Sequence, residues 1–199
     1  IPGAFKPDQY WNQENPAAHE ATTGREIWAQ TEGRITHLVA SVGTGGTITG
    51  TARALKARNP AIRVIGADPE GSVLSGDTAR TYLTEGVGED FFPGTYDPSV
   101  IDRWVRVSDR DAFAMARRIT REEGILAGES CGTAMVAALD EARRLMCEEP
   151  ESAADAVLVV ILPDTGRNYL SKLYNDEWMR ERGLLAATGA VTSVEELLR

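Results

Sequence analysis

Short apolar segments alternate with helical patterns along the chain. The segments 36–41, 63–69 and 104–107 have the length of strands, and 156–162, A-V-L-V-V-I-L, is the most strand-like run. Unbroken apolar character is typical of a strand covered on both faces, so we expect 156–162 at the buried centre of a parallel sheet. The repeated order of strand, turn and helix predicts an α/β fold, a three-layer, open, twisted, mostly parallel sheet with helices on both faces.

Helix signals lie between these strands. Asn15-Pro16 has the pattern of an N-cap followed by a first-turn proline, and it predicts one helix that ends at Gly33. Ser108 with Asp111 resembles a capping box. Further helices are expected over 47–58, 109–123 and 131–147, with helical segments from the turn at 163–166 to about Leu185. Residues 70–99 are rich in glycine, proline and aspartate and predict a long loop region, which in a compact domain is usually functional or mobile.

Composition narrows the classes of partner. The 199 residues carry a net charge of −9, which argues against binding to nucleic acid or to an anionic membrane. The longest apolar run is too short to span a bilayer. Cys131 and Cys147 would lie roughly 24 Å apart on one helix, too far for a disulfide, so we expect a reducing, cytoplasmic setting. The two histidines, His19 and His37, form no metal-ligand pattern, and we expect each to be structural or exposed.

The stretch S-V-G-T-G-G-T-I-T-G at 41–50 joins a strand to a helix. It lacks the G-K-[ST] of a Walker loop, and Ile48 stands where a dinucleotide fingerprint has its third glycine. What remains is a nest of backbone N–H groups and two hydroxyls at a helix N-terminus, contributed by Gly43, Thr44, Gly45, Gly46 and Thr47. Such a nest suits one phosphate monoester held without lysine or metal; the alternative is a tight turn with no ligand. Two other glycine-bearing turns follow strand-like segments, and all three should gather at the carboxyl edge of the sheet.

The same stretch resembles the phosphate-binding loop of the cysteine synthase/cystathionine β-synthase family, the fold-type II pyridoxal-phosphate enzymes with a tryptophan synthase β-like fold. The resemblance runs from N-Q-E-N-P-A-A-H to W-M-R-E-R-G-L-L. Three stretches, at 68–72, 85–91 and 161–172, resemble the cystathionine β-synthase branch of the family. The resemblance implies pyridoxal 5'-phosphate as cofactor, small amino-acid substrates and at least a homodimer.

The resemblance also implies roles for single residues. The segment from Gly43 to Thr47 would bind the cofactor phosphate and so fix where the ring lies. Ser130, in G-E-S-C-G, matches the serine whose hydroxyl meets the pyridine nitrogen. A hydroxyl is too weak an acid to keep that nitrogen protonated, which makes the ring a weaker electron sink and favours β-elimination. Without the resemblance, Ser130 could equally be a helix cap.

Two further turns match the family. Pro163 and Asp164 match the turn that flanks the ring, although an aspartate before T-G-R-N is also an ordinary turn residue. Gly86 and Gly88 belong to the E-G-V-G segment that closes over substrate, and a plain surface turn is the alternative. Many members of the branch have a tyrosine where this chain has Glu89. An acid there would repel a substrate carboxylate unless it points away or pairs with a cation, so the second substrate stays open.

The chain has three lysines, and none matches the family's S-x-K motif, which provides the Schiff-base lysine; they are Lys6, Lys56 and Lys172. The serine/threonine-glycine-asparagine loop that grips the substrate carboxylate is also missing. Both belong to the family's first half. We therefore expect 1–185 to be the C-terminal part of the catalytic domain, inactive alone. Residues 186–199 read as a linker with a helix start capped at Ser193, possibly towards a regulatory module, so we expect the natural chain to continue.

For the parent enzyme the resemblance implies a β-replacement by a lyase, in which serine and homocysteine condense to cystathionine and water. Cysteine synthesis from an activated serine and sulfide is the alternative in the same class. A nucleotide-dependent oxidoreductase would use Asp68 as its ribose-binding acid, but Ile48 breaks its motif. A non-catalytic half-domain that pairs with a partner chain is a further alternative.

Overall fold

The computed structural model describes residues 1–185, so the predicted linker at 186–199 lies outside the described residues. Four parallel strands form one sheet in the order β3-β2-β1-β4. They are β1 (His37–Ser41), β2 (Arg63–Pro69), β3 (Arg103–Val107) and β4 (Leu158–Val160). In the register, Val39 of β1 lies between Ile65 of β2 and Val160 of β4. The α/β class is confirmed.

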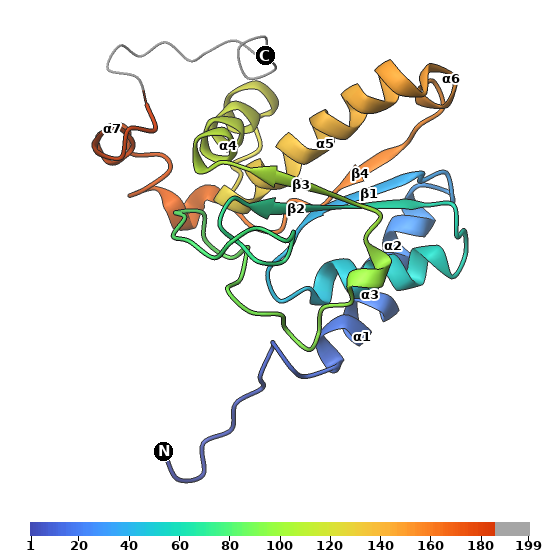
Figure 1. The fold of residues 1–199 in the computed structure, drawn as a ribbon, viewed down its shortest axis with the longest axis horizontal. Helices are drawn as coiled ribbons and strands as arrows, with labels where there is room; N and C mark the ends of the chain where they lie inside the picture. The colour runs from blue at the N-terminus through green and yellow to red at the C-terminus, as the bar shows by residue number, and fades with distance from the viewer. Residues whose placement is uncertain (186–199) are drawn as a thin grey trace.

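Helices cover both faces of this sheet, as Figure 1 shows. One face carries α1 (Glu14–Ala21), α2 (Thr23–Gln30) and α3 (Gly46–Lys56), and the other carries α4 (Asp109–Glu123) and α5 (Glu129–Glu148). Shorter elements are η1 (Pro98–Val100), α6 (Pro150–Ala153), η2 (Gly166–Tyr169) and α7 (Asp176–Glu181). The long loop expected over 70–99 is present and contains no helix or strand before η1.

The core follows from the two-residue period of the strands. In β1, Leu38 and Ala40 face α3 and pack with Ile48 and Leu55. Val39 faces the other way, in a cluster with the small alanines of α5. These small side chains let α5 lie close across the sheet, where it contacts all four strands.

The prediction for 156–162 is right in type and wrong in place. Only three of its residues form β4, they are half-buried, and within residues 1–185 the strand pairs with β1 alone. It is therefore an edge strand of the described sheet. An unbroken apolar run reports that both faces of a strand are covered; it carries no information about how many strands lie beside it.

The first helix also differs from its prediction. Two helices, α1 and α2, replace the single one, and they separate at Thr22. Asn15 lies inside α1 and the N-cap position belongs to Gln13, because the Asn15 amide is used elsewhere: it donates to the carbonyl of Gln9 and to Thr44 Oγ1. By contrast α4 has the predicted bounds, and its Ser108 cap accepts from Asp111 N at 3.2 Å.

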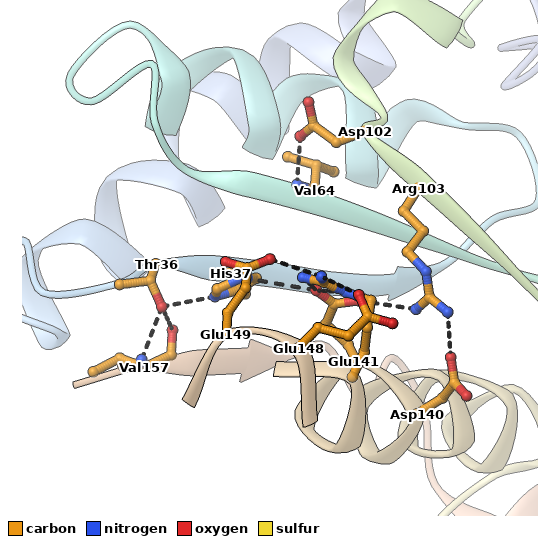
Figure 2. Close-up of polar contacts among 11 residues, drawn as sticks. Thr36, His37, Val64, Asp102, Arg103, Asp140, Glu141, Glu148, Glu149 and Val157 are labelled. Atoms are coloured by element: carbon orange, nitrogen blue, oxygen red, sulfur yellow. Dashed lines mark hydrogen bonds and ion pairs between the residues drawn. The ribbon is translucent and has the colours of Figure 1, made fainter. Parts of the chain in front are cut away.

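A cluster of charged side chains ties α5 to the amino ends of the strands (Figure 2). Glu141 of α5 is 2 % exposed; its Oε2 accepts from Arg103 of β3 at 2.8 Å and its Oε1 accepts from Arg144 at 2.8 Å. His37 Nε2 lies 3.8 Å from Oε1 of the same carboxylate. Burial by itself raises the pKa of Glu141, but the hydrogen bonds and charges of Arg144 and Arg103 outweigh it and lower the pKa.

In residues 1–185 no helix combines the length and the apolar character needed to cross a membrane. The described side chains also include no group of three or more His, Cys, Asp or Glu placed to hold a metal ion. Cys131 is buried and Cys147 is exposed, and both are free thiols.

Candidate functional site

Three turns meet at the carboxyl edge of the sheet around an open cavity of about 520 Å³. The turn after β1 contributes Gly43, Thr44, Gly45 and Thr47 to the lining. The long loop contributes Gly86, Gly88 and Glu89, and the turn after β4 contributes Pro163. Carboxyl ends of parallel strands meet at one edge, which is why segments so distant in sequence form one cavity.

The turn after β1 has the geometry of an anion cradle. Gly45 is the N-cap of α3 with φ +82°, and a Cβ there would lie 2.6 Å from the Cβ of Tyr96. A Cβ on Gly46 would lie 2.0 Å from Asn15 Oδ1. The first N–H groups of a helix have no acceptor within it and carry positive potential. These observations fit a phosphate group held by backbone N–H groups.

Side chains from α1 hold the two threonines of this cradle. Thr44 Oγ1 accepts from Asn15 Nδ2 at 3.1 Å, and the Thr44 carbonyl accepts from Thr95 Oγ1 at 2.7 Å. Thr47 Oγ1 lies 3.2 Å from His19 Nε2. Burial lowers the pKa of His19, so at neutral pH this histidine orients Thr47 as a neutral ring.

Asn15, His19 and Thr95 were not predicted as site residues. Asn15 was taken for a helix cap, and His19 was expected to be structural or exposed. The one signal was the N-Q-E-N-P-A-A-H stretch, whose likeness to the family extends to both residues. For Thr95 the local sequence offers no signal.

The loop that contains Gly86 and Gly88 lies directly on the phosphate cradle. Gly88 N donates to the Val42 carbonyl at 2.7 Å, and a Cβ on Gly43 would lie 2.8 Å from the Gly86 carbonyl oxygen. Gly88 has φ +74°, and a Cβ there would lie 2.4 Å from Pro69 Cγ. The two glycine turns predicted to be neighbours are therefore in contact.

The remaining predicted residues lie behind the cavity wall. Ser130 is 4 % exposed and is the second residue of α5, whose N-cap is Gly128, so the alternative that Ser130 caps the helix is wrong. Asp164 accepts from the Tyr169 hydroxyl at 2.6 Å and lies 3.5 Å from Cys131 Sγ. Among the described residues, the lining includes neither of these nor Gly46.

The charge of the cavity is unusual for a site that would hold an anion. No lysine or arginine of residues 1–185 lines it, and Glu89 is its one carboxyl group. Burial raises the pKa of Glu89, Asp90 and Asp68 raise it further, and a hydrogen bond with Tyr10 opposes the rise. No ion pair within the described part of the chain joins Glu89 to a cation. Burial, with acidic neighbours, raises the pKa of Tyr82 to about 12, so this phenol stays a hydrogen-bond donor.

Two features decide between the alternatives. Asp68 is fully buried and its Oδ2 accepts from Ser75 N at 2.9 Å, outside the cavity lining, so it is not placed to bind a ribose. The three lysines also lie outside the lining and form ion pairs, Lys6 with Asp8, Lys56 with Asp102 and Lys172 with Glu85.

Comparison with known proteins agrees with this geometry. The family model for pyridoxal-phosphate dependent enzymes matches residues 1–164. The chain belongs to this family. Cofactor chemistry in the family rests on pyridoxal phosphate, and the predicted cofactor is thereby confirmed.

Within the pyridoxal-phosphate dependent enzymes, the chain is similar to cystathionine β-synthases. It is 46 % identical to the protein of Mus musculus, over 93 % of this chain and 33 % of that protein. With the protein of Apis mellifera it shares 45 % identity, over 93 % of this chain and 36 % of the other. The chain thus spans about a third of the length of the curated relatives it matches.

A solved structure supports the fold assignment. The O-acetylserine dependent cystathionine β-synthase of Helicobacter pylori matches with a TM-score of 0.79 and 42 % identity, over 86 % of this chain and 54 % of that one. The predicted fold-type II architecture is therefore confirmed.

Proposed function

We propose that the full-length enzyme containing this chain catalyses a pyridoxal-phosphate-dependent β-replacement in which serine and homocysteine condense to cystathionine. The observation that carries the proposal is the contact between two glycine turns in one cavity. The turn after β1 offers a phosphate cradle, and the turn at Gly86 and Gly88 lies on it. The likeness to cystathionine β-synthases supports the choice of substrates.

In this proposal each group of residues has a separate task. The cradle from Gly43 to Thr47 anchors the phosphate and so fixes the position of the ring. When bound, the cofactor supplies an electron sink for the carbon next to the substrate amine. Ser130 lies next to the ring nitrogen and leaves it unprotonated, while Pro163 and Asp164 flank the ring.

The loop at Gly86 and Gly88 closes over the substrate and excludes water. Glycine at these positions lets the backbone approach the substrate closely, and the hydrogen bond from Gly88 to Val42 keeps the loop next to the phosphate cradle. Homocysteine enters the space between this loop and Tyr82.

Glu89 bears on the choice of the second substrate. Its carboxyl lines the cavity without a cationic partner in the described chain, so it disfavours a substrate carboxylate and favours an ammonium group beside it. Homocysteine offers an ammonium group and sulfide offers none. Glu89 therefore supports an amino-acid thiol, bound with its ammonium group towards the carboxyl.

The first substrate has a specific rival. The Helicobacter pylori enzyme is named as O-acetylserine dependent, and at 42 % identity this favours an activated serine as a second candidate. Cysteine synthesis from such a serine and sulfide is the corresponding alternative product.

The test offers the full-length holoenzyme serine or O-acetylserine as first substrate, and homocysteine or sulfide as second. Products are separated and identified by mass spectrometry. The proposal expects cystathionine from serine and homocysteine. Cystathionine from O-acetylserine alone would select the second candidate, and cysteine without cystathionine would contradict both. The homodimer, the lyase class and the cytoplasmic location stay predictions.

A further inference from the structure

Glu129 joins the substrate loop to the helix that carries Ser130. It is the first residue of α5, directly before Ser130, and it is 1 % exposed. Its Oε2 accepts from the backbone N–H of Glu85, 44 positions away, at 2.9 Å. Glu85 opens the E-G-V-G segment, so one carboxylate spans the two parts of the site.

Other groups fix the two sides of this contact. Asp109, the first residue of α4, accepts from Leu83 N at 2.7 Å and from Thr84 N at 2.9 Å. Beyond the segment, Gly88 N donates to the Val42 carbonyl at 2.7 Å. Between these fixed points Glu129 is the group that holds the Glu85 backbone.

We propose that Glu129 is a positioning residue that holds the loop of Gly86 and Gly88 against the start of α5 and so sets its place relative to Ser130. The consequence for substrate binding rests on the proposed function of this loop. A side chain that only filled space would need no carboxyl group at a position this deeply buried.

The charges around Glu129 make this contact sensitive to pH. The titratable groups that face it are Glu85 on the loop, Lys172 after η2, Asp109 on α4 and Tyr169 on η2. Burial raises the pKa of Glu129 to about 7; the Glu85 N–H and the Lys172 charge oppose the rise, and the Glu85 and Asp109 charges add to it. An ionised carboxylate accepts a stronger hydrogen bond than a protonated one. The loop should therefore be held more tightly above pH 7 than below it.

Hydrogen exchange tests the contact without any reaction. The full-length enzyme without substrate, its Glu129→Gln and Glu129→Ala variants, and the control Glu123→Gln, exposed at the end of α4, are compared over residues 82–90. In Glu129→Ala, exchange at the Glu85 amide should rise about tenfold or more. Glu129→Gln keeps an acceptor of the same shape, so its exchange should rise less.

The pH dependence provides a second readout. After correction for intrinsic exchange, protection of the Glu85 amide in the wild type should increase from about pH 6 to about pH 8. In Glu129→Gln it should be flat, because the titrating group is gone. Glu123→Gln should keep the wild-type profile.

Kinetics separate this inference from the proposed function. If the loop binds substrate, Glu129→Ala should raise KM more than it lowers kcat. Unchanged exchange in Glu129→Ala overturns the inference, whatever the kinetics show. Faster exchange with an unchanged KM upholds the positioning role and overturns the substrate role of the loop.

Discussion

Two buried glutamates on α5 lie about three turns apart and have opposite surroundings. Glu141, at the amino edge of the sheet, is bound by Arg103 and Arg144 and approached by His37. Glu129, at the carboxyl edge, accepts from one backbone N–H and has no cation in direct contact within residues 1–185. Their exposures are 2 % and 1 %, so burial does not distinguish them. Partners decide whether a buried carboxyl is charged.

The two edges consequently respond to pH in opposite directions. The pKa of Glu141 is lowered, so its stabilising effect is complete above the unfolded value near 4.5 and is lost as the pH falls through the folded value. The pKa of Glu129 is raised from 4.5 to about 7, so its ionisation destabilises the fold progressively between those values. The amino edge contributes to stability, and the carboxyl edge keeps an uncompensated group next to the site.

The largest effect is expected for Glu141→Gln. Loss of the charge leaves Arg103 and Arg144 without their shared partner, and unfolding at neutral pH should become easier by about 3 kcal/mol. The difference from wild type should shrink as the pH falls below about 4, where the native carboxylate is protonated. Urea unfolding of the full-length enzyme, followed by tryptophan fluorescence, measures this, with the exposed Glu123→Gln as control. A midpoint unchanged at pH 7 would contradict the role given to the cluster.

Glu129→Gln should act in the opposite direction. Because the variant cannot ionise, its stability should gain on the wild type as the pH rises from 4.5 to about 7, by up to about 3 kcal/mol, and then stay level. The same unfolding assay at a series of pH values detects the trend. A gain that grew on acidification instead would show that the native carboxyl is stabilised in its charged form.

Gly88→Ala should disturb the carboxyl edge locally. The residue has φ +74° and its new Cβ would lie 2.4 Å from Pro69 Cγ, so strain and contact together should cost about 2 kcal/mol. We expect a higher KM for the second substrate. Gly86→Ala is the matched control, because its φ is +77° but its Cβ would meet nothing within 4 Å. Equal effects in both variants would mean that backbone strain alone matters.

The smallest effect is expected for Asn15→Ala, which removes the hydrogen bonds to Thr44 Oγ1 and to the Gln9 carbonyl. Affinity for pyridoxal phosphate should fall by about 1 kcal/mol, or roughly fivefold. Fluorescence titration of the apoenzyme measures it. Asn12→Ala, which loses a hydrogen bond to Pro7 in the exposed N-terminal segment, should leave the affinity unchanged.

The sequence predicted those features that neighbouring residues determine. The bounds of β2 and α4 and the Ser108 cap follow from local patterns and were confirmed. The edge position of β4 and the role of Asn15 were not foreseen, because both depend on segments far away in the chain. The same holds for the contact between Glu129 and Glu85, which lie on separate turns.

The candidate site divides in the same way. Its glycine turns were recognisable from residue type and spacing, and the structure brings them together around one cavity. The side chains that hold these turns, His19 and Thr95 among them, carry no local signal, since hydroxyl and imidazole groups serve many structural purposes. The cofactor roles of Ser130 and Asp164 stay predictions.

The most direct test of the central claim, that the turn after β1 holds the cofactor phosphate, compares two ligands. Apoenzyme of the wild type and of Gly45→Ala is titrated with pyridoxal 5'-phosphate and with pyridoxal, which lacks the phosphate. In the variant the new Cβ would lie 2.6 Å from the Cβ of Tyr96 and displace the turn. The account predicts that affinity for pyridoxal phosphate falls about a hundredfold while affinity for pyridoxal stays the same. An equal loss for both ligands, or no loss for either, would contradict it.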